Sequence, residues 1–220
     1  MAAALAGGAA SASADVQQFD QYVLDFTNTP FATLSGAFGS GNTVGFHFSI
    51  AAAANVLNIG AGTVSATFAL PSFTVTARPN YILTGEITGS FGRFSYSEAP
   101  GASTTATVSG TSSIDGVVVA NYLDTPLTRF AITANNGEYG AVSATVGQGP
   151  FNEFKFTGGA LTLTATNGAI PFSNVSPQAS TELRISFTAL PVPEPESYAM
   201  LLAGLCLLGV IVRRRTRDDA

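Results

Sequence analysis

Charged residues are scarce in this chain of 220 residues: they make up 10% of it, against about 25% in a typical soluble domain. Lysine and arginine number 9 and aspartate and glutamate 14, which gives a formal net charge of −5. A surface that binds nucleic acid through phosphate contacts needs clustered cations. The shortage of bases therefore excludes that class and predicts a domain that does not adhere to anionic lipids.

Cysteine, histidine and tryptophan are also nearly absent. The single Cys206 cannot form a disulfide within the chain, so a disulfide framework is excluded. A Ser-His-Asp triad depends on its histidine, and a zinc site usually needs more than one nitrogen or sulfur ligand. His47, the only histidine, alternates with Phe46 and Phe48, so we expect it to be a surface or packing residue. We predict no catalytic residue, no metal and no cofactor.

Acidic residues could still act without histidine, because glycoside hydrolysis needs only two carboxylates. Asp20 with Asp25, or Glu138 with Glu153, could pair in space, although nothing in the spacing selects either pair. Calcium would accept oxygen ligands from an acidic loop, but no D-x-D-x-D-G pattern is present. A secreted glycan hydrolase with two carboxylates is therefore kept as the second alternative function.

Apolar residues alternate with Ser, Thr and Ala along residues 15–190, which is the period of half-buried strands. Asp115-Gly116, Asn136-Gly137 and Asn167-Gly168 predict turns between strands. The residues predicted to share strand faces are Val44, Phe46, Phe48, Ile50; Val64, Ala66, Phe68, Leu70; Phe73, Val75, Ala77; Phe130, Ile132, Ala134; Val142, Ala144, Val146; Phe154, Phe156; Leu161, Leu163, Ala165; and Leu183, Ile185, Phe187. This pattern predicts one all-β domain, an antiparallel β-sandwich of jelly-roll or immunoglobulin-like type.

The first 14 residues, MAAALAGGAASASA, are small and apolar. Ala12-Ser13-Ala14 fits the A-x-A form of a secretory cleavage site. No basic residue precedes it. The stretch is therefore interpreted either as the remnant of a signal peptide that starts upstream of Met1 or as a flexible leader. The C-terminal segment favours the signal peptide, with cleavage directed by Ala12 and Ala14.

The C-terminal segment, residues 191–220, has three consecutive parts. Pro193-Glu194-Pro195 comes first, an apolar run from 199 to 212 follows, and basic residues follow at the end: Arg213, Arg214, Arg215 and Arg217. Fourteen helical residues span about 21 Å, less than the roughly 30 Å of a hydrocarbon core. Tyr198 can anchor one end of the helix at the membrane interface, and the arginines can extend their side chains to the other interface. Both effects lengthen the part of the chain that spans the membrane. We therefore predict one transmembrane helix, 198–212, with the arginines as a cytoplasmic stop-transfer signal; a plain single-pass anchor is the alternative.

This order of motif, apolar helix and arginines resembles the PEP-CTERM sorting signal of Gram-negative bacteria. The resemblance implies export, brief anchoring in the inner membrane, and processing near Pro193-Glu194-Pro195 by an exosortase, an integral-membrane enzyme resembling a cysteine transpeptidase. It also implies release to the cell surface or the exopolysaccharide matrix. The nucleophile then belongs to the exosortase, so Cys206 is not catalytic. We expect a non-catalytic structural or interaction protein, with a carbohydrate-binding module as the first alternative.

Overall fold

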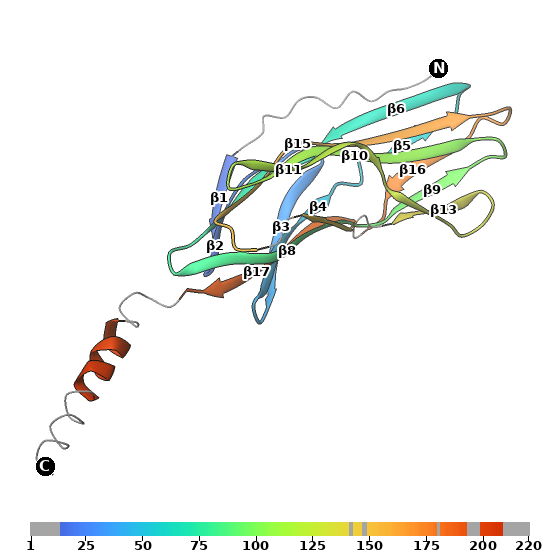
Figure 1. Cartoon of the computed structure of the whole chain (residues 1–220). Helices are drawn as coiled ribbons and strands as arrows, with labels where there is room; N and C mark the ends of the chain where they lie inside the picture. The colour runs from blue at the N-terminus through green and yellow to red at the C-terminus, as the bar shows by residue number, and fades with distance from the viewer. Residues whose placement is uncertain (1–13, 141–142, 147–148, 180, 193–198, 209–220) are drawn as a thin grey trace, which may run out of the picture.

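The computed structural model describes residues 14–140, 143–146, 149–179, 181–192 and 199–208. One helix, 199–208, follows a domain of strands (Figure 1). The strands are β1 (Ala14–Gln18), β2 (Tyr22–Thr27), β3 (Ala32–Ser40), β4 (Thr43–Ile50), β5 (Val56–Asn58), β6 (Gly62–Ala69), β7 (Ser72–Ala77), β8 (Tyr81–Phe91), β9 (Phe94–Glu98), β10 (Ser103–Ile114), β11 (Val117–Pro126), β12 (Thr128–Ala131), β13 (Asn136–Gly140), β14 (Ser143–Val146), β15 (Glu153–Asn167), β16 (Ser173–Pro177) and β17 (Glu182–Pro191).

The strands form three antiparallel sheets. Sheet A is seven-stranded, in the order β1-β2-β7-β15-β10-β11, with β6 pairing with β15 beside β7. Sheet B has the order β14-β8-β17-β4-β3, and sheet C has the order β12-β13-β9-β16-β5. The prediction of an all-β antiparallel domain is confirmed, and the choice between jelly-roll and immunoglobulin-like types stays a prediction.

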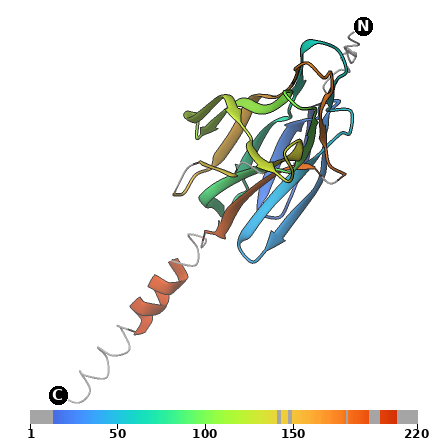
Figure 2. The ribbon, with the colours of Figure 1, turned by 90° about the vertical axis from the view of Figure 1, so that its right-hand side faces the viewer.

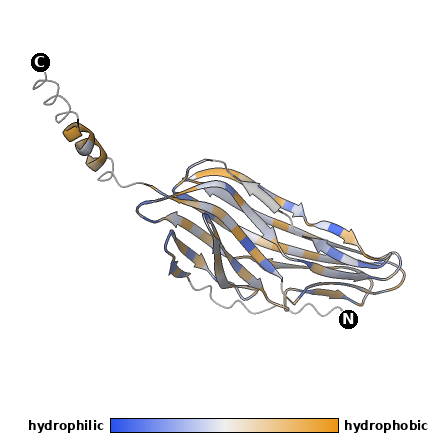
Figure 3. Cartoon of the chain, turned by 90° about the horizontal axis from the view of Figure 1, so that it is seen from below, coloured by the Kyte–Doolittle hydropathy of each residue, from blue (hydrophilic) through white to orange (hydrophobic). Residues whose placement is uncertain are grey.

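Sheet A faces both of the shorter sheets, so the core has two layers. At one end, the Phe73 ring on β7 lies 5.1 Å from the ring of Phe46 on β4, between ring centroids. At the other end, Asn58 on β5 donates from Nδ2 to the carbonyl oxygen of Ala165 on β15, at 3.0 Å. The longest strands, β10 and β15, cross from the half that faces sheet B to the half that faces sheet C. Alternating hydrophobic and polar bands along the strands are visible in Figure 3.

A bulge in β15 explains how one strand serves both halves. Phe154 and Phe156 face sheet B, whereas Leu161 and Leu163 face inward from positions of the opposite parity. Between them, Gly158 and Gly159 on β15 lie opposite the single Gly110 on β10. Gly158 has φ 63°, and a Cβ on Gly159 would lie 2.5 Å from the Phe156 ring. The extra residue reverses the alternation, so both apolar sets are buried.

Most predicted strand faces are confirmed, including the buried sets of β4, β7 and β17. The Asp115-Gly116 turn is also confirmed, with φ angles of 47° and 79° that fit a tight hairpin. The side chains of Val142, Ala144 and Val146 lie outside the described residues.

Two expectations near Phe130 are wrong. The Asn136-Gly137 pair lies inside β13, and the chain turns at 132–135 instead. There the Thr133 hydroxyl accepts a hydrogen bond from the Asn136 amide at 3.1 Å, which closes a different turn. Phe130 and Ile132 are exposed because β12 is the edge strand of sheet C. The Phe130 ring lies over the bare backbone of Gly140.

Candidate functional site

The C-terminal segment emerges from the middle of sheet B. Strand β17 lies between β4 and β8 and pairs with both along most of its length. Its inward side chains, Leu183, Ile185, Phe187 and Ala189, are all buried, as the alternation predicts. Two hydrogen-bonded neighbours and a buried face place β17 among the most firmly held elements of a fold. The segment after it is therefore attached to a rigid base.

Val192 lies at the point where the chain leaves the sheet. Pro191 is still in register with Tyr81 on β8, and the Val192 amide donates to the Asn80 carbonyl oxygen at 2.8 Å. The Ala189 amide donates to the Asn42 carbonyl oxygen at 2.9 Å. Pro193, the first residue of the predicted sorting motif, follows Val192 directly. The domain and the motif are thus contiguous.

Most of the predicted sorting residues lie outside the described residues. These are Ala12, the motif Pro193, Glu194 and Pro195, the anchor Tyr198, and the basic residues Arg213, Arg214, Arg215 and Arg217. Ala14 is described: it is the exposed first residue of β1 and pairs with Thr27. Cleavage after Ala14 would therefore remove only one residue of an edge strand.

The helix at 199–208 is apolar and exposed. Orange, the hydrophobic colour, dominates it in Figure 3, and Figure 2 shows it pointing away from the strands. Its large apolar side chains are between 57% and 76% exposed: Met200, Leu201, Leu202, Leu205, Leu207 and Leu208. Exposed leucines without a protein partner are costly in water. Among the described residues, no helix has both the length and the apolar character needed to cross a membrane.

The distance between the domain and the helix is short. Seven residue steps separate Val192 from Ala199, and a fully extended chain of that length reaches at most about 25 Å. An enzyme acting on this segment must therefore work close to the end of sheet B. The loops at that end of sheet B therefore form the surface that such an enzyme would contact.

An open hollow of about 500 Å³ lies at this end of the domain. It is lined by the β1–β2 turn, residues 18–22, and by the β3–β4 hairpin. The hairpin turn contains Asn42, whose carbonyl oxygen accepts the Ala189 hydrogen bond, so the hollow adjoins the exit of β17. Asp20 lines it, whereas Asp25 lies on the outer face of β2. The structure thus does not bring this pair of carboxylates into one hollow.

The other predicted carboxylate pair lies on two different sheets. Glu138 on β13 of sheet C accepts hydrogen bonds from Arg93, at 3.0 Å, and from Gln178, at 2.7 Å. Glu153 begins β15 in sheet A, where its amide donates to the Asp115 carboxylate at 2.8 Å. Within the part of the chain that the structure describes, no three metal-ligating side chains gather in one place.

His47 lies on the outer face of sheet B, as its alternation with buried phenylalanines predicts. Its Nε2 lies 3.8 Å from a carboxylate oxygen of Glu182. Its ring stacks against Phe38 at 6.2 Å between centroids, and the Arg184 guanidinium lies 3.7 Å from the centre of the same Phe38 ring. These are contacts between neighbouring side chains on a strand surface.

A buried polar cluster joins sheet A to sheet C, and sequence reasoning missed it. Glu98 on β9 accepts a hydrogen bond from Arg129 and another from Thr104 on β10, both at 2.6 Å. Thr104 also lies 2.9 Å from the Tyr139 hydroxyl. Burial raises the pKa of the Tyr139 phenol. The signal was available: Glu98 continues the buried alternation of Phe94 and Tyr96, so its carboxylate had to face the interior.

Residues 191–215 match the PEP-CTERM protein-sorting motif. No curated protein matches the chain. Two solved structures of infectious bursal disease virus do, from the Gx and Gt strains, each at 14% identity. They cover 83% and 81% of this chain with TM-scores of 0.19 and 0.18. The chain spans about half of each viral chain, at 50% and 49%.

The tail match agrees with the geometry of the exit from sheet B. It begins at Pro191, the last residue of β17, and extends through the exposed apolar helix to the arginines. The C-terminal segment of this chain is a PEP-CTERM protein-sorting motif, the signal of exported proteins that are sorted by an exosortase.

Proposed function

We propose that this chain is a surface or exopolysaccharide-matrix protein with a structural or interaction role and no catalysis of its own. Its precursor is held in the inner membrane by a transmembrane helix at 198–212, with the arginines in the cytoplasm. An exosortase cleaves it near Pro193-Glu194-Pro195. The observation that carries the proposal is the junction at Val192, where a firmly held strand passes directly into the sorting motif.

Cleavage at this junction leaves the fold complete. The last buried side chain of β17 is Ala189, and Val192 makes the last backbone bond to the domain within the described part of the chain. A proline-rich segment also lacks several amide donors and favours an extended backbone, which suits presentation to a protease-like groove. The enzyme would therefore find its substrate extended while the domain beside it stays folded.

The non-catalytic role is supported by the positions of the acids. The two candidate carboxylate pairs are divided between a hollow and an outer face, and between two sheets. The best buried carboxylate, that of Glu98, is already held by Arg129 and Thr104. The Glu98 carboxylate thus joins sheet C to sheet A.

Localisation tests the proposal. The full-length chain and a variant ending at Val192 are expressed in a host that contains an exosortase, and both are followed by fractionation. We expect the full-length chain in the surface or matrix fraction, and the truncated chain folded but in a different fraction. A matched variant, Pro193→Ala with Pro195→Ala, keeps the helix and should accumulate unprocessed in the membrane. Equal fractionation of all three chains would contradict sorting by this segment.

Neutral glycan binding is the second candidate, and the outer face of sheet A favours it. Hydroxyl side chains of β6 and β15 pair across the strands at 2.9 to 3.0 Å: Thr63 with Thr166, Ser65 with Thr164, and Thr67 with Thr162. Ser103, Thr105 and Thr107 of β10 continue these rows. An uncharged hydroxyl surface suits an uncharged polysaccharide. Binding to neutral polysaccharide that is lost in Thr105→Val with Thr164→Val would support it, and absence of binding would remove it.

A further inference from the structure

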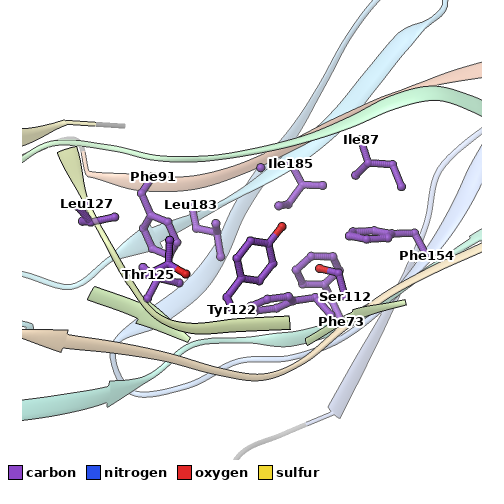
Figure 4. A pocket seen from close by; sticks show the side chains of 13 residues that line it. Phe73, Ile87, Phe91, Ser112, Tyr122, Thr125, Leu127, Phe154, Leu183 and Ile185 are labelled. Carbon is purple, nitrogen blue, oxygen red and sulfur yellow. The ribbon is translucent and has the colours of Figure 1, made fainter. Parts of the chain in front are cut away.

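A small cavity lies between sheets A and B, away from the sorting segment. Its volume is about 70 Å³. Phe73, Phe154 and Phe156 of sheet A form one wall, and Ile87, Leu183 and Ile185 of sheet B form the other. Figure 4 shows the side chains of Phe73, Phe154, Ile87, Leu183 and Ile185 around a common space, with the Tyr122 ring among them. None of the described residues that line the cavity is charged, so a charged ligand would find no partner among them.

Two hydroxyl groups project into this apolar space. Tyr122 on β11 and Ser112 on β10 both line the cavity, and the side chain of Ser112 acts on the Tyr122 phenol. Burial raises the pKa of the Tyr122 phenol, which keeps the group neutral and able to donate. Tyr122, Thr125 and Gly89 are only half-buried, whereas Ser112, Phe73 and Ile87 are buried. Solvent therefore reaches the cavity from the side of β11, the edge strand of sheet A.

Gly89 is the residue that leaves the cavity open. It faces inward on β8, between β14 and β17, with an ordinary strand backbone. Among the described side chains, a Cβ added there would meet only Ile185 Cδ1, at 3.5 Å, an ordinary van der Waals contact. Gly45 is different, because a Cβ there would lie 2.5 Å from the Phe38 ring. Glycine inside a strand weakens the sheet, and it marks a bulge or a close approach of another group. Among the described side chains, none requires glycine at position 89.

We propose that this cavity binds a small neutral aliphatic molecule that carries one hydrogen-bonding group, such as a short alcohol or carbonyl compound. The carbon chain packs against the phenylalanine, isoleucine and leucine walls. The polar group bonds to the hydroxyls of Tyr122 and Ser112. The cavity has about the volume that two water molecules take in the liquid, and half of the 150 Å³ that holds benzene in an engineered core. That volume admits a chain of about three carbons.

The test is a titration with straight-chain alcohols, followed through the methyl NMR signals of Ile87, Leu183 and Ile185. From ethanol to 1-propanol we expect the affinity to rise about fourfold, the value of one buried methylene group. From 1-butanol to 1-hexanol we expect it to fall, because the cavity is full. If the affinity rose steadily through 1-hexanol, and the exposed Val118 and Leu123 methyl signals gave the same affinities, the alcohols would be binding to the surface. That result would overturn the proposal.

Variants test whether 1-propanol binds in the cavity or elsewhere on the sheet. Gly89→Val fills the space and should abolish the 1-propanol shifts, whereas Thr88→Val, on the opposite face of β8, should retain them. Tyr122→Phe keeps the ring and removes one hydroxyl, so it should weaken 1-propanol binding about fivefold. If Gly89→Val does not fold, Tyr122→Phe against Thr88→Val decides the matter. Unchanged binding in Tyr122→Phe, or retained binding in a folded Gly89→Val, would refute the site. Sorting of the chain should be normal in every folded variant.

Discussion

The buried pair of Glu98 and Arg129 yields an asymmetric prediction, because its two members differ in burial. The side chain of Glu98 is 5% exposed and that of Arg129 is 39% exposed. Removing the arginine leaves a carboxylate deep in the interior with Thr104 as its remaining partner. Removing the carboxylate leaves a guanidinium that can turn to water. Breaking this ion pair should therefore lower the free energy of unfolding by different amounts, depending on which of the two residues is replaced.

The magnitudes follow from the group that is left behind. Breaking a buried pair costs about 3–5 kcal/mol when a charge remains unpaired. We expect Arg129→Met to lie at the low end, about 3 kcal/mol, because solvent reaches the arginine side of the pair. Glu98→Gln keeps its shape and loses one charge-assisted hydrogen bond, so about 1.5 kcal/mol is expected, the low end for such a bond. The double variant should cost less than Arg129→Met alone, since the amide carries no charge.

Urea unfolding followed by far-UV circular dichroism measures these free energies. Because the chain has no tryptophan, dichroism is a more direct probe than fluorescence. A matched control is Arg93→Met, which removes a cation whose partner, Glu138, also binds Gln178. Its cost should be below 1 kcal/mol, since Arg93 is well exposed. If Glu98→Gln cost as much as Arg129→Met, or if the two costs simply added, the reasoning from burial would be refuted.

Three further predictions follow from single residues. Burial raises the pKa of the Tyr22 phenol. The neutral phenol therefore stabilises the fold below the unfolded pKa of about 10, and this stabilisation is lost as the pH rises further. Tyr22→Phe should reduce the loss of stability above pH 10 in alkaline unfolding curves, and an unchanged curve would contradict this. Gly159→Ala should destabilise the domain by about 1–3 kcal/mol in urea, because its Cβ would meet Phe156 and Leu70; Gly116→Ala meets no such obstacle and serves as a comparison whose cost is backbone strain alone. N-terminal sequencing of the exported protein should begin at Asp15, and a chain that keeps Met1 would contradict the signal peptide.

Local alternation was enough to predict most strands and their buried faces, because strand faces are set by neighbours two residues apart. It failed where a longer-range contact decided the outcome. Phe130 alternates like a core residue, yet its strand lies at the edge of sheet C and its ring covers Gly140. Phe156 and Leu161 belong to one strand, and only the pairing of Gly158 and Gly159 opposite Gly110 shows this.

The features of the candidate site also differ in whether the sequence alone could predict them. The sorting segment is contiguous in sequence, so its order of motif, apolar run and arginines was readable directly. The Glu98 cluster and the Tyr122 cavity are assembled from strands far apart in the chain. Thr104 and Tyr139, for example, are 35 residues apart and meet only through the packing of sheet A on sheet C. Sequence spacing carries no information about such contacts.

The junction at Val192 makes one measurement decisive: the intact mass of the mature protein recovered from the surface or matrix fraction of an exosortase-containing host. Processing at the sorting motif predicts a chain that begins at Asp15 and ends near Pro193–Pro195, without the apolar helix and the arginines. A chain that still ends at Ala220 in every fraction would contradict the account and establish the segment as a permanent anchor.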